Sequence, residues 1–258
     1  WEYGRRNKNV WDKQIVSSLE AKKITPATGT TVTLGAAGDT VDVSATALKT
    51  NTVKDAGGNT LFTSDGSGTI TSINSAFKGG LIFISSQTAT GVSSVNFTTG
   101  IDSTYNEYVF YFYNCHPSSA SGTHFEFQGS TDGGSNYNVT MTTTIFRAAH
   151  KQDDTSASVA YMASYDQAQG TAYQMLGEYV DGSQSDGSIA GELHLFNPSS
   201  TTYVKQFYAT TQMYNYFPAS DNNFMAGYFN TTTAINAISF KFTSGTIDAG
   251  TIAMYGTG

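Results

Sequence analysis

The chain has 258 residues, of which 13% are charged and 13% aromatic, and its net charge is −7. Residues that suit pleated sheets, such as Thr, Tyr, Phe, Val and Ile, are common, whereas residues that propagate helices are sparse after the first 25 positions, so the composition predicts an all-β fold. The net negative charge argues against binding to nucleic acid or to an anionic membrane. The sequence has no run of about 18 apolar residues, so no membrane-spanning helix is expected.

The cysteine content and the first residues bear on where the protein works. Cys115 is the only cysteine, so no disulfide within the chain is expected. The first residues lack the apolar core of a signal peptide. A protein that acts outside a cell without such a signal is expected to leave by lysis. Both features fit a component of a virion that is assembled in the host cytoplasm.

Residues 1–26 are predicted to form an N-terminal anchor segment, helical or extended. Trp11, Ile15 and Leu19 are spaced four residues apart, as on one face of a helix, and a helix this short needs a partner to pack against. Basic residues outnumber acidic ones here, although the rest of the chain is acidic. The segment is either a solvated helix face or an anchor that docks on another virion protein. The candidate anchor residues are Trp1, Arg5, Arg6, Trp11, Ile15 and Leu19.

Residues 27–77 are predicted to form a β-rich neck or shaft. Strands of four or five residues alternate with clusters of turn formers, such as DAGGN at residues 55–59. The apolar residues are too few to make a core from one chain, so we expect this segment to wrap around identical chains in a homotrimer. A loose β-rich linker is the alternative. The residues expected to meet across the three-fold axis are Val41, Val43, Leu61 and Ile70.

Residues 78–258 predict an antiparallel β-sandwich. Longer strands with alternating apolar and polar residues recur between turn clusters, as in THFEFQ at residues 123–128 and AISFKF at residues 237–242. We expect about eight to ten strands in a jelly-roll-like arrangement.

The strand at residues 107–113 is bulky on both faces. Alternation divides its side chains into two sets: Tyr108, Phe110 and Phe112, and then Val109, Tyr111 and Tyr113. We therefore expect this strand to be central and covered on both sides, by the opposite sheet and by a neighbouring subunit. The alternative is that its tyrosines form a shelf on which sugar rings stack.

No pattern of catalytic or metal-ligating residues stands out. STDGGSNY, at residues 130–137, has the form of an Asp-box turn, which we interpret as a structural hairpin. The histidines have no spacing typical of a zinc site, and no GxSxG elbow marks a nucleophile. Cys115, at the end of an aromatic strand, is expected to be a small buried side chain. We therefore predict a protein that is not an enzyme and has no metal, cofactor or catalytic residue.

Two regions combine aromatic with small polar residues, EYVDGSQSDG at 178–187 and QMYNYFPASDNN at 212–223. Aromatic side chains beside small hydrogen-bonding groups make an adaptable recognition surface, and the low formal charge suits a neutral glycan. Packing between subunits is the alternative. The candidate binding residues are Tyr179, Asp181, Tyr214, Tyr216, Asp221 and Asn222.

Several of these segments together resemble a known family. TVTLGAAGDTVDV (31–43), the turn-rich stretch 51–74, GELHLFNPSSTTYVKQFYATT (191–211) and the stretch 224–256 look like the fibre-type virion structural proteins of marine tailed phages, particularly cyanophages. The resemblance covers roughly residues 28–258. It implies a homotrimeric fibre or appendage in which a β-rich stalk carries a distal sandwich. The first 25 residues match no pattern of that family.

Three functions are consistent with these features. The first is a phage tail fibre or appendage, attached to the particle by its N-terminus and contacting a host surface glycan through its sandwich. The second is a capsid decoration protein or head fibre that stabilises or covers the shell. The third is a depolymerase or glycosidase, which needs two carboxylates about 5 to 10 Å apart in a cleft. Because the sequence singles out no such pair, we expect the tail fibre.

Overall fold

The computed structural model describes residues 50–74 and 80–257. The predicted anchor, residues 1–26, lies outside the described residues, as do Val41 and Val43 of the predicted neck. The described part of the chain is almost entirely β-structure, as the composition predicts, with one short 3₁₀ turn and no α-helix. It therefore includes no helix long and apolar enough to cross a membrane.

Residues 50–74 form a three-stranded antiparallel meander of β1 (Thr52–Lys54), β2 (Thr60–Ser64) and β3 (Ile70–Ile73). An aspartate organises each of its two turns. Asp55 Oδ1 accepts the backbone N–H of Asn59 at 2.8 Å, and Asp65 Oδ1 accepts that of Ser67 at 2.7 Å. Local hydrogen bonds of this kind are the reason that Asp and Gly are favoured in tight turns.

The meander has one apolar row and no core of its own. Val53, Phe62 and Ile73 lie directly opposite one another in register. None of the residues from 50 to 74 is buried, and Ile73 is 58% exposed. Because a small sheet is stable only when its apolar face is packed against something, this row requires cover from outside residues 50–74.

The chain forms two compact units, residues 1–74 and residues 75–258. The described part of the second unit is a β-sandwich. The expectation of about eight to ten strands was too low, because β5, β9 and β10 have only three to five residues each and are hard to recognise. The thirteen strands are β4 (Ile82–Thr88), β5 (Val95–Phe97), β6 (Glu107–Pro117), β7 (Thr123–Ser130), β8 (Met141–Lys151), β9 (Ala157–Tyr161), β10 (Ala168–Gly170), β11 (Gln174–Val180), β12 (Ile189–Phe196), β13 (Lys205–Asn215), β14 (Ala219–Phe229), β15 (Ala237–Phe242) and β16 (Ile247–Thr257).

Eight of these strands follow the jelly-roll order. One sheet has the order β4-β16-β6-β12 and the other the order β5-β15-β7-β11, with every neighbouring pair antiparallel. Counted along the chain, these are strands 1-8-3-6 and 2-7-4-5 of an eight-stranded jelly roll, the double Greek key in which the chain crosses repeatedly between two sheets. The expected jelly-roll-like sandwich is therefore confirmed.

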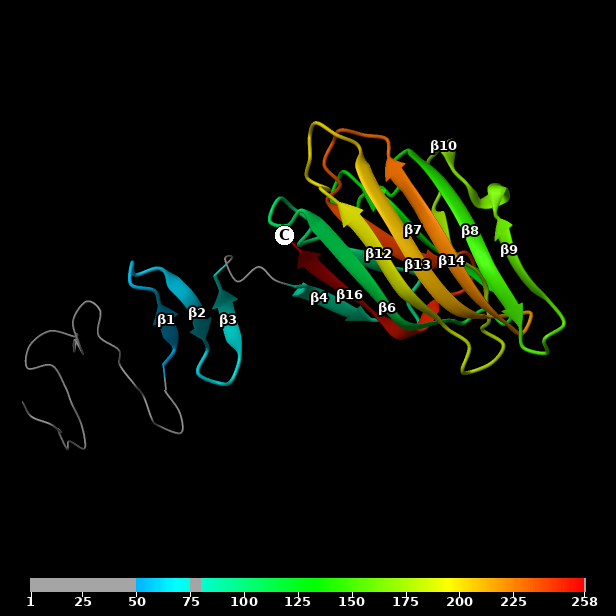
Figure 1. Ribbon diagram of the computed structural model, residues 1–258, viewed down its shortest axis with the longest axis horizontal. Coiled ribbons are helices and arrows are strands. Elements are labelled where there is room, and N and C mark those ends of the chain that lie inside the picture. Colours follow the sequence, from blue (N-terminus) through cyan, green and yellow to red (C-terminus); the bar gives the residue numbers. More distant parts are fainter. Residues whose placement is uncertain (1–49, 75–79, 258) are drawn as a thin grey trace, which may run out of the picture. The chain divides into compact units, whose positions relative to one another are not determined.

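Two insertions widen the first sheet. The β13–β14 hairpin and the segment from β8 to β10 add strands beyond β12, which gives the order β4-β16-β6-β12-β13-β14-β8-β9. Figure 1 shows these long strands lying next to one another across the broad side of the sandwich. We call the side of this eight-stranded sheet that faces away from the second sheet the outer face. A broad sheet that is covered on one side only leaves many side chains of the outer face in solvent.

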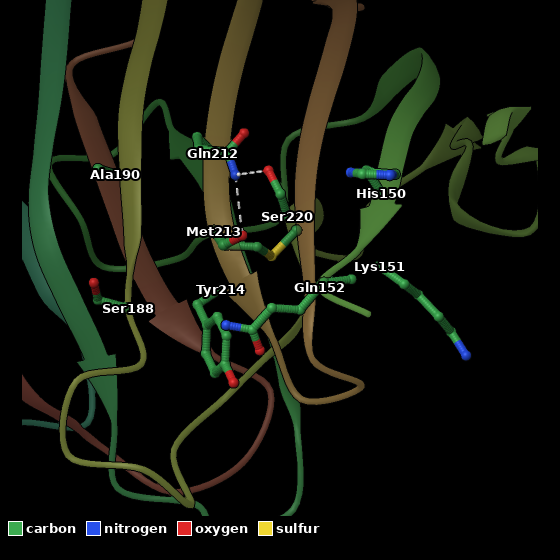
Figure 2. Close-up of a pocket in the computed structure, with 10 residues that line it drawn as sticks. His150, Lys151, Gln152, Ser188, Ala190, Gln212, Met213, Tyr214 and Ser220 are labelled. Carbon is green, nitrogen blue, oxygen red and sulfur yellow. Dashed lines mark hydrogen bonds between the residues drawn. The ribbon is translucent and has the colours of Figure 1, made fainter. Parts of the chain in front are cut away.

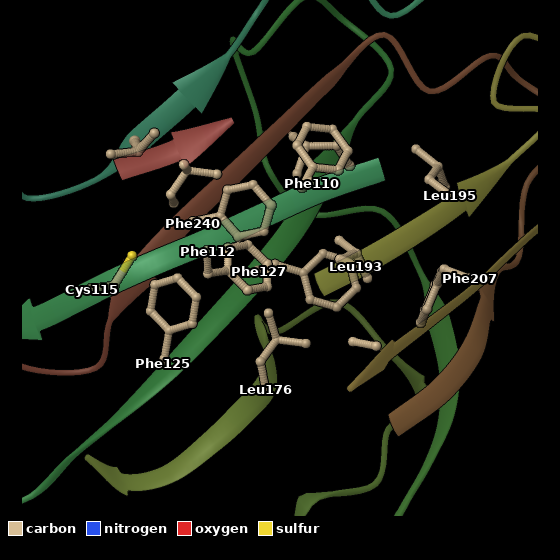
Figure 3. Close-up of a cluster of buried hydrophobic side chains, with 14 of the residues drawn as sticks. Phe110, Phe112, Cys115, Phe125, Phe127, Leu176, Leu193, Leu195, Phe207 and Phe240 are labelled. Atoms are coloured by element: carbon tan, nitrogen blue, oxygen red, sulfur yellow. The ribbon is translucent and has the colours of Figure 1, made fainter. Parts of the chain in front are cut away.

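Phenylalanine rings fill the space between the sheets. Phe240 of β15 lies at the centre of the cluster, with its ring centroid 5.4 Å from that of Phe110 and 5.1 Å from that of Phe112. Figure 3 shows these rings together with Phe125 and Phe127, which come from β7. All five are buried. Of the two sets predicted for strand 107–113, that of Tyr108, Phe110 and Phe112 therefore lies in the core.

Candidate functional site

The two regions that combine aromatic and polar residues lie side by side in the structure. The end of β11 meets the hairpin of β13 and β14 where Val180 pairs with Asn215. The backbone N–H of Tyr216 donates to the carbonyl of Tyr179 at 2.8 Å. The pairing of β11 with the inserted strand β13 thus brings together residues that are about 35 positions apart in the sequence.

The candidate side chains from these regions divide between two sites. Alternation along β13 and β14 places Tyr214 and Asn222 on the outer face, whereas Asp221 points between the sheets and is 1% exposed. Tyr179 lies at a bulge of β11 and lines the same inner cleft as Asp221. Asn222 donates its side-chain amide to the carbonyl of Thr211 and does not line a cavity.

The other two candidates have local roles. Asp181 is buried, and its Oδ1 accepts both the backbone N–H of Ser183 at 2.7 Å and the Ser183 hydroxyl at 2.6 Å. Tyr216 is exposed, and its ring lies against that of Phe217 with the centroids 5.4 Å apart. Asp181 and Asp221 are therefore not surface residues. The carboxylate of Asp181 stabilises its own turn, and that of Asp221 lies between the sheets.

A shallow groove of about 460 Å³ crosses the outer face between β12, β13, β14 and the end of β8. Small side chains at Ser188, Ala190 and Ser220 leave this space, and Tyr214 and His150 also line it. Figure 2 shows the groove, with the side-chain amide of Gln212 donating to Ser220 Oγ at 2.9 Å and to the carbonyl of Met213 at 3.1 Å. The groove therefore presents hydroxyl, amide and imidazole groups beside one aromatic ring.

A row of aromatic rings crosses the outer face next to the groove. Tyr161 of β9, Phe146 of β8 and Phe224 of β14 are paired in register on adjacent strands. The rings of Phe146 and Phe224 are stacked, with centroids 4.9 Å apart and planes inclined by 13°. Tyr161 is 62% exposed and Phe146 44%. Side chains directly opposite in a sheet are close enough to form one continuous surface, so this row, which we call the platform, is a continuous aromatic patch.

A second aromatic group occupies the middle of the outer face. Tyr208 of β13 stacks on the imidazole of His194 of β12, with centroids 4.4 Å apart and planes inclined by 12°. His194 Nδ1 lies 2.5 Å from Glu107 Oε1, so this carboxylate holds the imidazole in place. Tyr208 and Glu192 are both partly exposed, which gives this group an aromatic face with a carboxylate beside it.

The tyrosines of β6 belong to a third group on the same face. Tyr111 packs against Tyr113 and against Tyr255 of β16, whose ring contacts that of Phe83 of β4. β6 is central in its sheet, as expected, but its outer side is not fully covered in the chain described, since Tyr113 is 48% exposed. Alternation along residues 107–113 predicted these tyrosines. The row on β8, β9 and β14 was missed, although alternation along residues 219–229 places Phe224 on the same side as Asn222.

Two phenols of the outer face, those of Tyr111 and Tyr208, have a raised pKa. Burial, and secondly the nearby charge of Glu192, raise the pKa of Tyr111. Burial, followed by the charges of Glu107 and Glu192, raises the pKa of Tyr208. Each phenol therefore keeps its proton and acts as a hydrogen-bonding group. Exposed aromatic rings among hydroxyls and amides are suited to a ligand with both apolar faces and hydroxyl groups.

The Asp-box segment forms the turn that follows β7. Asp132 Oδ1 accepts the hydroxyl of Ser130 at 2.6 Å and the backbone N–H of Asn136 at 2.9 Å. These hydrogen bonds, first from Ser130 and then from Asn136, lower the pKa of Asp132 to about 2. The carboxylate is thus used within its own hairpin, which agrees with the structural interpretation of this motif.

The thiol is unreactive, and no metal site is found in the ranges described. Cys115 is buried, as expected, and burial raises the pKa of its thiol to about 12, which keeps it protonated. Within residues 50–74 and 80–257, no group of three or more His, Cys, Asp or Glu side chains is placed to hold a metal ion.

Comparison with known proteins does not identify the chain. No protein-family model matches it, and neither a curated protein nor a solved structure is significantly similar to it.

Proposed function

We propose that this chain is a structural protein of a phage particle, a homotrimeric tail fibre or appendage that binds a neutral glycan on the host surface. The N-terminal segment attaches it to another virion protein, and the outer face of the sandwich contacts the host. The observation that carries this proposal is the combination of an open groove with three groups of exposed aromatic rings on one sheet face. Jelly rolls occur in viral and lectin domains, which is support by fold analogy alone.

The outer face suits a sugar better than a charged ligand. Formal charges are few among the residues that line the groove, where hydroxyl and amide groups from Ser188, Gln212 and Ser220 predominate. A pyranose ring has an apolar face that stacks on an aromatic ring and hydroxyls that bond to such groups. Weak contacts of this kind multiply when three subunits and several fibres engage one cell surface. Adhesion therefore needs no tight single site.

Removal of one ring from the platform is expected to weaken glycan binding. Phe146→Ala deletes an exposed ring while leaving the inward side of β8 unchanged, so the protein should fold. We expect a loss of about 1 kcal/mol per site, roughly fivefold in affinity, measured with the full chain on immobilised neutral glycans. Tyr203→Ala removes an exposed tyrosine from the loop between β12 and β13 and should bind like the wild type. Equal binding by wild type and Phe146→Ala would count against the platform.

Self-association would provide the cover that the meander lacks. Residues 50–74 are the described part of the first compact unit and bury none of their side chains, and a small sheet with an exposed apolar row is stable only when that row is packed against something. Residues 50–74 include no cysteine and no described metal cluster, and the row of Val53, Phe62 and Ile73 carries no charge that would repel a second copy. Three copies meeting along this row form the neck of the proposed trimer. This row replaces the contact of Leu61 and Ile70 that the sequence predicted, because Leu61 is next to Phe62 in β2 and points to the other side of the sheet.

A charge placed in this row should dissociate the trimer. Ile73→Asp puts a carboxylate on the apolar side of β3, so we expect the mass of the full chain in solution, measured by light scattering, to fall from three chains to one. Ser72→Asp places the same charge on the opposite side of the same strand, where Ser72 lies opposite Thr63, and should leave the trimer intact. A wild-type monomer, or a trimer that survives Ile73→Asp, would refute this neck.

A capsid decoration protein or head fibre is the second candidate. Phe146, Phe224 and the exposed Val159 lack hydroxyl groups, and such a patch also suits contact with another protein. The copy number separates the two functions. A decoration protein is present in numbers set by the capsid lattice, whereas a tail fibre is present in a small multiple of six. In both cases the protein acts without catalysis, and release of reducing sugar from a host polysaccharide by the full chain would contradict that.

A further inference from the structure

A second cavity opens at one end of the sandwich, on the inner side of the eight-stranded sheet. This end cleft has a volume of about 190 Å³ and lies between β8, the end of β11 and the start of β14. Arg147, Glu178 and Asp221 line it, together with the rings of Tyr179 and Phe217. The end cleft and the groove of the outer face meet at Lys151 and Ala219, which line both, and the strands β8 and β14 lie between their other lining residues.

Charged side chains at the end cleft form one connected network. Arg147 Nη1 donates to Glu178 Oε2 at 2.5 Å and lies 3.3 Å from Asp221 Oδ2. Tyr165 donates its hydroxyl to Glu178 Oε1 at 2.7 Å, and Asn215 donates its amide to Asp221 Oδ2 at 2.6 Å. One cation thus faces two carboxylates, and both oxygens of Glu178 have partners.

Four polar atoms beside this network have no hydrogen-bond partner among the described residues. They are Asp221 Oδ1, Arg147 Nε and both amide atoms of Asn223, and none of them is exposed to bulk solvent. Asn223 lies directly opposite Arg147 in the register of β14 and β8, and it follows Asp221 on the inward side of β14. A buried polar atom without a partner is destabilising, so this concentration of four in three neighbouring residues is unusual for a purely structural position.

The unpartnered atoms select the chemistry of a ligand. Two are acceptors, on Asp221 and Asn223, and two are donors, on Arg147 and Asn223. An alcohol hydroxyl both donates and accepts, so it satisfies both kinds. An ammonium group satisfies only the acceptors, and an anion satisfies only the donors.

The walls of the cleft add an apolar element to this pattern. The rings of Tyr179 and Phe217 meet edge to face with centroids 5.5 Å apart, and Phe217 is exposed at the mouth. Aromatic rings beside hydroxyl-binding atoms fit a sugar residue, and the volume is below the usual range for larger ligands. We infer that the end cleft is a second binding site, which takes one neutral monosaccharide unit. A hydroxyl of the sugar passes Asp221 and Arg147, which line the cleft, to reach Asn223, which lies opposite Arg147 on β14 and outside the lining. The inference rests on the proposed glycan binding for the source of the sugar.

Entry to this site requires movement of one side chain. The unpartnered atoms are buried and do not face the open space of the cleft. The incoming hydroxyl therefore takes the place of the guanidinium of Arg147 beside Asp221, which is the longer of the two contacts of Arg147. The Arg147 side chain is 27% exposed, so on binding we expect it to shift toward the mouth of the cleft. Its shorter contact, with Glu178, stays in place. A water molecule has the same hydrogen-bonding pattern as the hydroxyl, and the experiment must separate these two occupants.

Alanine methyl groups distinguish the two cavities. Ala149 lines the end cleft, and Ala190 lines the groove of the outer face. The full chain, labelled at alanine methyl groups, is titrated with methyl α-D-glucopyranoside, methyl α-D-mannopyranoside and methyl β-D-galactopyranoside and followed by NMR. We expect at least one glycoside to shift the Ala149 resonance in a saturable manner.

Matched variants assign that shift to the unpartnered atoms. Asn223→Val removes two of them and should weaken the Ala149 response by about tenfold or more, since several hydrogen bonds are lost. Asp221→Asn keeps the shape of the side chain and should also weaken it. Asn96→Val, at an exposed position of β5 in the second sheet, should leave the Ala149 response unchanged.

The other outcomes separate the two proposals. Shifts at Ala190 alone would overturn the inference and leave the proposed function standing. No shift at either methyl group would leave water as the only occupant of the cleft and would count against both proposals. A shift at Ala149 that survives both Asn223→Val and Asp221→Asn would place the sugar elsewhere in the cleft and overturn the assigned contacts.

Discussion

Phe240→Ala is expected to destabilise the sandwich by about 3 to 5 kcal/mol, the range found when a fully buried phenylalanine is truncated. The ring of Phe240 is fully buried and contacts those of Phe110 and Phe112 from the opposite sheet and that of Phe97 from the neighbouring strand β5. Truncation removes these contacts and leaves a cavity that neighbouring rigid rings fill poorly. A fall of roughly 10 °C in the melting temperature should accompany the loss.

The measurement is urea unfolding of the full chain followed by circular dichroism. Both tryptophans, Trp1 and Trp11, lie in the N-terminal segment, so tryptophan fluorescence is a poor probe of the sandwich. Tyr203→Ala is the control, because truncation of an exposed side chain usually changes stability by less than about 0.5 kcal/mol. A loss below about 1 kcal/mol for Phe240→Ala would mean that Phe240 is not at the centre of the core.

Arg147→Met is expected to cost about 3 kcal/mol near pH 7. The change keeps most of the apolar stem but leaves Glu178 and Asp221 buried without their shared cation. Breaking a buried pair costs about 3 to 5 kcal/mol, and the lower end applies because the guanidinium is partly exposed to solvent. Arg147→Lys retains the charge and should lose less.

The cost of Arg147→Met should depend on pH in a defined direction. Burial already raises the pKa of Asp221, and the charge of Arg147 opposes that rise. Without the arginine the folded-state pKa rises further above its unfolded value, so stability is greatest when the carboxyl is protonated and falls as pH increases through the folded pKa. The deficit relative to wild type should therefore shrink between about pH 7 and about pH 4. Equal deficits at both pH values would show that packing, and not charge, is what Arg147 contributes.

Local patterns predicted the parts of the fold that depend on single strands. Alternation along residues 107–113 placed Phe110 and Phe112 on the same side of their strand, and the turn formers around Asp55 and Asp65 marked the hairpins of the meander. Period-two alternation predicts which side of a sheet a residue occupies without knowledge of its neighbours. It does not report the order of strands, so the sandwich was predictable and its two insertions were not.

The candidate site was predicted only in part, because it depends on strand register. Tyr214 lines the groove, but the groove exists because Ser188, Ala190 and Ser220 come together from three segments. The residues around Asp221 are polar, as in a surface loop. In the structure, however, Asp221 belongs to β14, where it pairs with Met213 of β13, and its side chain is buried between the sheets. The Arg147 network likewise joins residues more than 30 positions apart, and no local pattern reports such a meeting.

A cryo-EM map of the virus particle that carries this protein, with the protein labelled, tests the central claim most directly. The proposed function predicts labelled density at the ends of fibres attached to the tail, with three copies in each fibre. Density spread over the shell would identify a decoration protein and make the aromatic outer face a contact between proteins. Absence of the label from purified particles would contradict the virion assignment altogether.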